Sequence, residues 1–532
     1  ICCNSWETPL IGAVLYEMLA GRRAFSGFGR EEPAPISGVS QELQQIVARC
    51  LRRDPAERFQ AAAELKAALE RVAQEPQATP SIAVLPFANL SADKENEYFS
   101  DGLAEEIISA LTKLPGLRVP ARTSSFAFRG KEVDVTEIGA KLKVGHILEG
   151  SVRKAGDRIR VTAQLINVAD GYHLWSERYD RRMADVFDIQ DEIAHAIVER
   201  LRVQFTGEQP LVKRHTANLD AYHLYLKGRY WWNTLTSEGF NKAVECFERA
   251  IAQDPGFALP YTGLVMAYAY LGNHGWTNPL ELMPKAKEYA LKALAIDETL
   301  AEAHWAHALV LYFYDWDWLE AEREFRRAVA LNPRDATIGM FFAFLLLHTG
   351  RTEEALAEGA RSLALEPVSV ETNRHMTYLY CDARRFDQAI AQGQRTVELH
   401  PHYASAYLNL GLAYLYSEMY GEAVETFQAA RVIARGDPLY DFCLACVYAR
   451  SGKQTEAWEI LGNLERLGYG AMWLGSLCAA LGDRDRAFGF LEKAFHRREG
   501  LLPSINVEPV VDPLRSDPRF ADLVRRIGLE AA

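Results

Sequence analysis

The stretch PHYASAYLNLGLAYLYSEMYGEAVETFQAARVIA (residues 401–434) decides how most of this chain folds. It contains two apolar segments of helical period, one around Gly411 and one around Phe427, joined by a short polar connection. Prolines end successive segments of this kind at positions 34 residues apart: Pro333, Pro367 and Pro401. Such a period is typical of stacked pairs of antiparallel helices, because each pair buries its apolar face only against the next pair. The chain is therefore predicted to be mainly α-helical.

The same residue types recur on both sides of this unit. Small residues stand where the two helices of a pair cross closely and aromatic residues fill the other contacts, as with Trp305, Ala321 and Phe325. The pattern resembles the tetratricopeptide repeat (TPR) family. It predicts an open α-solenoid of about seven or eight helix pairs over residues 220–532, closed by a capping helix that begins at Asp517.

In the TPR family, the first helix of each pair lines a concave groove that takes peptides or partner domains. We count the groove-facing positions from the small residues Ala321, Ala355, Ala389 and Ala423. The candidates are Phe313, Met340, Phe344, Leu347, Arg374, Tyr378, Leu408 and Leu412. Because most of them are apolar or aromatic, they predict a hydrophobic surface that binds a protein or peptide partner. The alternative is that they pack against neighbouring repeats or a folded-back domain.

Residues 81–206 follow a different pattern, which predicts a small α/β domain. SIAVLPF (residues 81–87) is a candidate buried strand, and Asp101 is expected to cap the next helix. A short strand at LRVPA (residues 117–121), a second helix, three strands and a last helix follow, and the polar face of the strands implies helices on the other face alone. Through LEGSVRKAGDRIRVTAQLI and HLWSERYDR, the block resembles the TolB-like amino-terminal domain of bacterial signalling proteins.

One loop of this block gathers polar and basic side chains. The candidates for an anion site are Arg122, Ser124, Ser125, Arg129 and Lys131. The simpler interpretation is a solvated loop in which Phe126 and Phe128 turn into the core. No Gly-rich phosphate loop follows the first strand, so no nucleotide or other cofactor is expected.

Residues 1–75 resemble the end of a bacterial serine/threonine protein kinase domain. The stretches IGAVLYEMLAGRRAFSG (residues 11–27) and IVARCLRRDPAERFQAAAELKAAL (residues 46–69) carry the resemblance, which implies a helical remnant of the kinase C-lobe. In that family the arginine at Arg58 pairs with a glutamate that this chain lacks. The Gly-rich loop, lysine and aspartates of phosphoryl transfer are missing as well, so the chain is predicted not to be an enzyme.

Composition and spacing argue against several other kinds of site. The 532 residues carry a net charge of −12 without a basic block, so no nucleic-acid partner is expected. The C-x-x-C of Cys443 and Cys446 has no second ligand pair, and His304 and His307 have no third ligand, so no metal is expected. The longest apolar stretch, around residues 338–347, is too short to cross a bilayer, and the cysteine usage favours a reducing, cytoplasmic location.

These observations leave three functions open. The first is a non-enzymatic scaffold or adaptor in bacterial signalling that binds protein partners through the TPR groove. The second is the output arm of a serine/threonine kinase whose catalytic part is missing from this chain. The third is a sensor that binds a small anion or metabolite through the α/β domain.

Overall fold

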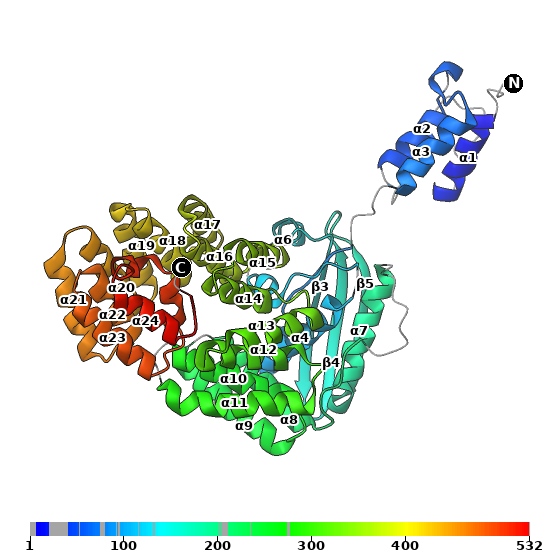
Figure 1. Ribbon diagram of the computed structural model, residues 1–532. Coiled ribbons are helices and arrows are strands. Elements are labelled where there is room, and N and C mark those ends of the chain that lie inside the picture. The colour runs from blue at the N-terminus through cyan, green and yellow to red at the C-terminus, as the bar shows by residue number, and fades with distance from the viewer. Residues whose placement is uncertain are drawn as a thin grey trace. The chain divides into compact units, whose positions relative to one another are not determined.

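The computed structural model describes residues 7–20, 41–52, 54–74, 80–91, 93, 96–114, 116–130, 133–201, 203, 211–234, 236–273 and 277–530. The chain divides into two compact units, Ile1–Thr79 and Pro80–Ala532. The predicted class is confirmed, since the described part is mainly helical and its one sheet precedes a solenoid of helix pairs (Figure 1). None of the described helices combines the length and the hydrophobicity that crossing a bilayer requires.

The described residues of the first unit form three helices and a short 3-10 turn. They are α1 (Glu7–Ala20), α2 (Gln41–Cys50), η1 (Pro55–Glu57) and α3 (Ala62–Gln74). The Asp54 side chain accepts a hydrogen bond from the backbone N–H of Ala56 at 2.9 Å, so the Asp-Pro step between the helices is a capped turn. Phe59 and Leu65 pack into one small core with Ile46.

The sheet opens the second unit. Its strands are β1 (Ile82–Val84), β2 (Ala88–Asn89), β3 (His146–Ala155), β4 (Arg158–Asn167) and β5 (His173–Arg182). The last three form an antiparallel meander, and β1 and β2 each pair with β3 in parallel. The alternation predicted along β4 is confirmed, because every second residue is fully buried: Ile159, Val161, Ala163 and Leu165.

Helices cover parts of both faces of this sheet. They are α4 (Glu97–Thr112), α5 (Arg122–Phe126), α6 (Val135–Leu142) and, after the turn η3 (Met183–Asp185), α7 (Val186–Arg200). α4 and α7 share a core with Ile82 and Leu148, whereas α6 packs against Ala83 and Ile147. The expectation of a single covered face is therefore wrong at β1, whose three residues are all buried.

Two local predictions in this block are also wrong. α4 begins at Glu97, so Asp101 lies inside the helix and is only 3% exposed, where Arg129 neutralises it. Buried Phe99 lies one turn before Leu103 and Ile107 on the same apolar face of the helix. The strand expected at residues 117–121 is reduced to one bridge between Ser81 and Arg118, since Pro120 has no N–H to donate to a ladder.

Among the described residues, eight helix pairs follow the sheet. They stack one after another along the chain (Figure 1). The first four are α8 (Leu219–Trp232) with α9 (Ser237–Gln253), α10 (Ala258–Asn273) with α11 (Pro279–Ile296), α12 (Ala301–Val310) and its π-helical extension η4 (Leu311–Asp315) with α13 (Trp318–Leu331), and α14 (Ala336–His348) with α15 (Thr352–Leu365). The last four are α16 (Val370–Asp382) with α17 (Phe386–Leu399), α18 (Ala404–Tyr416) with α19 (Tyr420–Ile433), α20 (Pro438–Arg450) with α21 (Gln454–Arg466), and α22 (Ala471–Ala480) with α23 (Arg484–His496).

Small residues let the helices of each pair approach closely. The alanines that mark the repeat are all fully buried: Ala321, Ala355, Ala389, Ala423 and Ala457. A Cβ atom added to Gly411 would lie 2.5 Å from a ring carbon of Phe427, so this ring fills the space that the missing side chain leaves. Gly228 stands in the same relation to Phe247, at 2.4 Å. These contacts explain the small-and-aromatic signature of the sequence.

The C-terminal segment (residues 501–530) runs back along the first helices of the pairs. It comprises η5 (Leu502–Asn506), η6 (Pro509–Leu514) and the predicted capping helix α24 (Pro518–Arg526). Arg384 donates two hydrogen bonds to the Asp512 carboxylate, at 2.5 and 2.7 Å, and the indole N–H of Trp318 donates to the carbonyl of Ile527 at 3.0 Å. The groove that the sequence predicts to be open is therefore partly filled by the chain itself.

Candidate functional site

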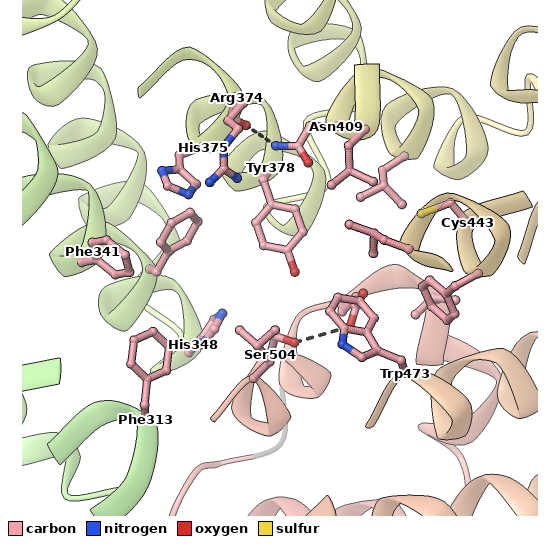
Figure 2. A pocket seen from close by; sticks show the side chains of 18 of the residues that line it. Phe313, Phe341, His348, Arg374, His375, Tyr378, Asn409, Cys443, Trp473 and Ser504 are labelled. Carbon is pink, nitrogen blue, oxygen red and sulfur yellow. Dashed lines mark hydrogen bonds between the residues drawn. The ribbon is translucent and has the colours of Figure 1, made fainter. Parts of the chain in front are cut away.

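An apolar cavity of about 220 Å³ lies between the first helices of successive pairs, from α10 to α22, and the C-terminal segment (Figure 2). We call it the groove cavity. Its walls are mainly aromatic and aliphatic side chains, which include Phe313, Phe341, Phe344, Leu412, Phe442 and Trp473. The C-terminal segment closes one side with Leu501, Ser504, Glu508 and Val510.

Six of the eight predicted groove residues line this cavity: Phe313, Phe344, Arg374, Tyr378, Leu408 and Leu412. The other two, Met340 and Leu347, do not, since each is 1% exposed and packs in the core of the neighbouring pairs. Successive residues of a helix turn by about 100°. Met340 and Leu347 therefore both lie roughly 50° to one side of Phe344. The cavity lies on its other side, where Phe341 and His348 stand.

Several lining residues were not predicted from the sequence. Phe341 and His348 lie three residues before and four residues after Phe344, so a helical wheel centred on Phe344 could have included them. Trp473 comes from a later pair, and Ser504 and Glu508 come from the C-terminal segment. No periodic pattern marks these last two, because the segment has no repeat.

One end of the cavity carries a positive charge that is already balanced. The Arg374 guanidinium binds the Glu371 carboxylate, with Nε 2.8 Å from Oε2, and the Asn409 side-chain amide donates to the Arg374 carbonyl at 2.6 Å (Figure 2). The His375 ring meets the Phe344 ring edge to face at 5.4 Å between centroids. Burial, together with nearby Arg374, lowers the pKa of His375 to about 3, so this imidazole is neutral at pH 7.

The opposite end combines a neutral imidazole with a buried carboxyl group. His348 Nδ1 lies 2.9 Å from the Tyr312 hydroxyl oxygen, and burial lowers the pKa of His348 to about 3. Glu508 is 3% exposed, and burial raises the pKa of its carboxyl group to about 7. The Ser504 hydroxyl donates to Glu508 Oε2 at 3.4 Å. The cavity thus offers apolar surface with hydrogen-bonding groups and little net charge.

The residues of the predicted anion loop do not form a basic site. Arg122, Ser124 and Ser125 lie on α5 instead of a loop, and both serines are fully buried. Arg122 pairs with Glu105, and Arg129 pairs with Glu97 and Asp101. Lys131 lies outside the described residues. Because both guanidinium groups already bind carboxylates, the arrangement does not favour an anion at these positions.

The paired cysteines and histidines pack within the solenoid. Cys443 and Cys446 line the groove cavity, and burial raises the pKa of both thiols. His304 Nδ1 lies 2.6 Å from Glu324 Oε2, and His307 Nδ1 lies 3.7 Å from the other oxygen of that carboxylate. Across the described residues, no three His, Cys, Asp or Glu side chains are grouped in a way that could hold a metal ion.

Two protein families match parts of this chain. Residues 404–430 match the family model described as "Tetratricopeptide repeat". This stretch, which comprises α18 and most of α19, is a tetratricopeptide repeat. Residues 77–196, which include the sheet and its helices, match the model described as "HilA/YgeH-like transcriptional regulator, second domain". The resemblance of this block to a TolB-like domain stays a prediction.

Relatives of known name each match a part of the chain. "Putative adenylate cyclase 3" of Rhizobium meliloti is 39% identical over 241 residues, which are 44% of this chain and 40% of that protein. "Transcriptional regulator HilA" of Salmonella typhimurium is 23% identical over 284 residues, or 52% of this chain and 49% of that protein. "Serine/threonine-protein kinase PknB" of Mycobacterium tuberculosis is 37% identical over 86 residues, 14% of each chain. The chain thus spans half or less of the length of each.

A solved structure of a thermophilic TPR protein from Thermus thermophilus is also similar. It is 19% identical, with a TM-score of 0.32 over 37% of this chain and 99% of that chain.

Proposed function

We propose that this chain is a non-enzymatic interaction protein in bacterial signalling, whose TPR groove binds a peptide segment of a partner by taking one large apolar side chain into the groove cavity. The observation that carries the proposal is the aromatic lining of that cavity by the first helices of successive repeats. TPR repeats supply the surface that would hold the rest of the peptide.

The size of the cavity supports a single side chain as the occupant. An apolar cavity of about 150 Å³ in another protein takes up benzene, so one of about 220 Å³ admits a leucine, phenylalanine or tryptophan side chain. Burying such a side chain contributes roughly 1.5–3 kcal/mol. The C-terminal segment limits how much more of a partner the inner face can accept.

The proposal is tested by selecting ligands for the whole chain from a randomised displayed peptide library. We expect the selected peptides to share one aromatic or leucine residue. Half-buried Leu412, changed to Asp, places a charge in the cavity, and binding of the selected peptides should fall by about tenfold or more, which corresponds to 1.4 kcal/mol. Phe344→Asp should have the same effect.

Val432→Asp is the matched control. Val432 is 79% exposed on α19, so the same charge at this position should leave peptide binding unchanged. Equal binding by the Leu412→Asp and Val432→Asp variants, or a selection without any shared apolar residue, would remove the groove cavity from the proposed function.

A kinase connection is the second candidate, and the 37% identity to a serine/threonine kinase over 86 residues favours it. In this reading the repeats are the output arm of a longer protein that carries a kinase, while the present chain itself transfers no phosphate. Incubation of the purified chain with labelled ATP and a general acceptor protein should give no transfer above a no-protein control. Transfer that scales with the amount of chain would contradict the non-enzymatic assignment.

A further inference from the structure

A second cavity, of about 250 Å³, lies where the α/β block meets the first repeats. We call it the junction cavity. It is lined by α4, the start of α5, the first helices α8, α10 and α12, and the start of α14. Unlike the groove cavity, it is rich in ionisable side chains, and five of these carry carboxyl groups: Glu105, Glu106, Glu302, Asp335 and Glu366.

Three of the five carboxyl groups have partners within the protein. Glu105 binds two guanidinium groups, that of Arg122 and that of Arg229, the latter at 3.2 Å. Asp335 caps α14 by accepting the backbone N–H groups of Thr337 and Ile338 at 2.9 and 3.0 Å. Glu366 accepts hydrogen bonds from the hydroxyl groups of Thr123 and Thr372, each at 2.9 Å. The hydrogen-bonding and charge requirements of these three carboxyl groups are therefore met within the fold.

The remaining two carboxyl groups, on Glu106 and Glu302, make no hydrogen bond or ion pair with any described residue. They lie close enough that the charge on Glu302 raises the pKa of Glu106, which burial already brings to about 7. The nearby cations do not pair with them, since Arg229 binds Glu105 and Lys113 is exposed at the rim. A buried carboxyl group beside a second, partly buried one without a partner favours a cationic group between them.

The same cavity is lined by side chains whose N–H groups have no acceptor. The indole N–H of Trp305, a residue that is 6% exposed, makes no hydrogen bond in the described part of the chain. The indole N–H of Trp232 and the side-chain amide of Asn233 are buried and unpartnered as well. Buried donors in folded proteins are nearly always paired, so these three point to a missing acceptor.

We propose that the junction cavity binds a small zwitterion of the amino-acid class, with its ammonium group between Glu106 and Glu302 and its carboxylate on the N–H groups of Trp305, Trp232 and Asn233. A simple anion would leave the two glutamates without a partner, and a simple amine would leave the three donors without one. The volume exceeds that of an apolar cavity of about 150 Å³ that takes up benzene in another protein, so a small amino acid fits. Such a ligand bridges the α/β block and the repeats.

The test is calorimetric titration of the full chain with each protein amino acid in turn, with ethylamine and acetate as probes that carry only one of the two charges. We expect saturable binding of one or a few amino acids and at least tenfold weaker binding of both probes, as the loss of a charge-assisted hydrogen bond predicts. Binding of no amino acid, or equally tight binding of ethylamine or acetate, would overturn the proposal.

Variants locate the site. Glu302→Gln keeps the shape of the side chain but removes its charge, and Trp305→Phe removes the N–H donor; each should weaken amino-acid binding by about tenfold. Glu425→Gln removes one charge from an exposed position of α19 and should leave binding unchanged. Circular dichroism of each variant checks that it is folded. Unchanged binding by folded Glu302→Gln and Trp305→Phe would place the ligand elsewhere. The Leu412→Asp variant of the groove cavity should bind the amino acid normally, so the two proposals fail independently.

Discussion

Changing Glu508 to Gln should stabilise this protein more at pH 8 than at pH 5. Glu508 belongs to the C-terminal segment, is 3% exposed and lines the groove cavity. Burial raises the pKa of its carboxyl group from 4.5 to about 7. Between these two values the folded chain binds more protons than the unfolded chain, so the free energy of unfolding falls as the pH rises through this window and is constant above it.

The pKa difference sets the size of the effect. Relative to a protonated Glu508, ionisation of this group lowers the free energy of unfolding by about 3 kcal/mol at pH 8 and by about 1 kcal/mol at pH 5. The free energy of unfolding of the wild type should therefore fall by about 2 kcal/mol between pH 5 and pH 8. The second unit spans residues 80–532, and unfolding entropies of about 2 cal/mol/K per residue convert this loss to a melting-temperature change of about 2 °C. Glutamine at position 508 keeps the shape of the side chain and cannot ionise.

The assay is thermal unfolding of the wild-type and Glu508→Gln chains at pH 5 and pH 8. The difference in melting temperature between the two chains should grow by about 2 °C toward pH 8, whereas Glu425→Gln, at an exposed position, should follow the wild type at both values. If the wild-type and Glu508→Gln chains change in parallel, Glu508 is not a buried carboxyl group that ionises in this window, and the placement of the C-terminal segment inside the groove is wrong.

Three further outcomes follow from the packing. Gly411→Ala should lower the free energy of unfolding by about 1–3 kcal/mol because the new methyl group meets the Phe427 ring, whereas Gly421→Ala, with nothing within 4 Å, should be neutral or stabilising; denaturant titration measures both. Arg384→Ala should cost no more than about 1 kcal/mol because the pair with Asp512 is partly exposed, yet it should speed proteolysis after residue 500; Arg385→Ala, which removes an exposed pair with Glu353, should not. Cys443 and Cys446 should resist alkylation by iodoacetamide until the chain is denatured, because burial raises the pKa of both thiols; mass spectrometry of native and denatured samples would reveal labelling of the folded chain.

Periodicity along the chain was enough to predict the helix pairs and much of their inner face. The segments that end at Pro367 and Pro401 are regular helix pairs in the structure, α14 with α15 and α16 with α17. Six of the eight predicted groove residues meet in one cavity, because a helical period fixes which positions share a face. The two wrong residues, Met340 and Leu347, come from an error of about 50° in the predicted rotation of one helix about its axis. Since successive residues are about 100° apart, an error of this size is half the spacing between two residues.

Contacts between distant residues were beyond prediction from the sequence. The carboxylates that pair with Arg122 and Arg129 belong to the preceding helix, α4. The positive charge of the segment predicted as an anion site is therefore neutralised within the fold. Likewise, Glu106 and Glu302 are 196 positions apart, and no pattern along the chain indicates that they line one cavity.

The sequence by itself determined the repeating helix pairs and the alternating strands, since both depend on residues that are near neighbours along the chain. Tertiary structure alone decided that the C-terminal segment enters the groove and that the α/β block joins the first repeats around a polar cavity. The physical reason is that burial and ion pairing depend on distance in space. A tail without a period, such as residues 501–514, carries apolar residues but no signal of the surface that buries them.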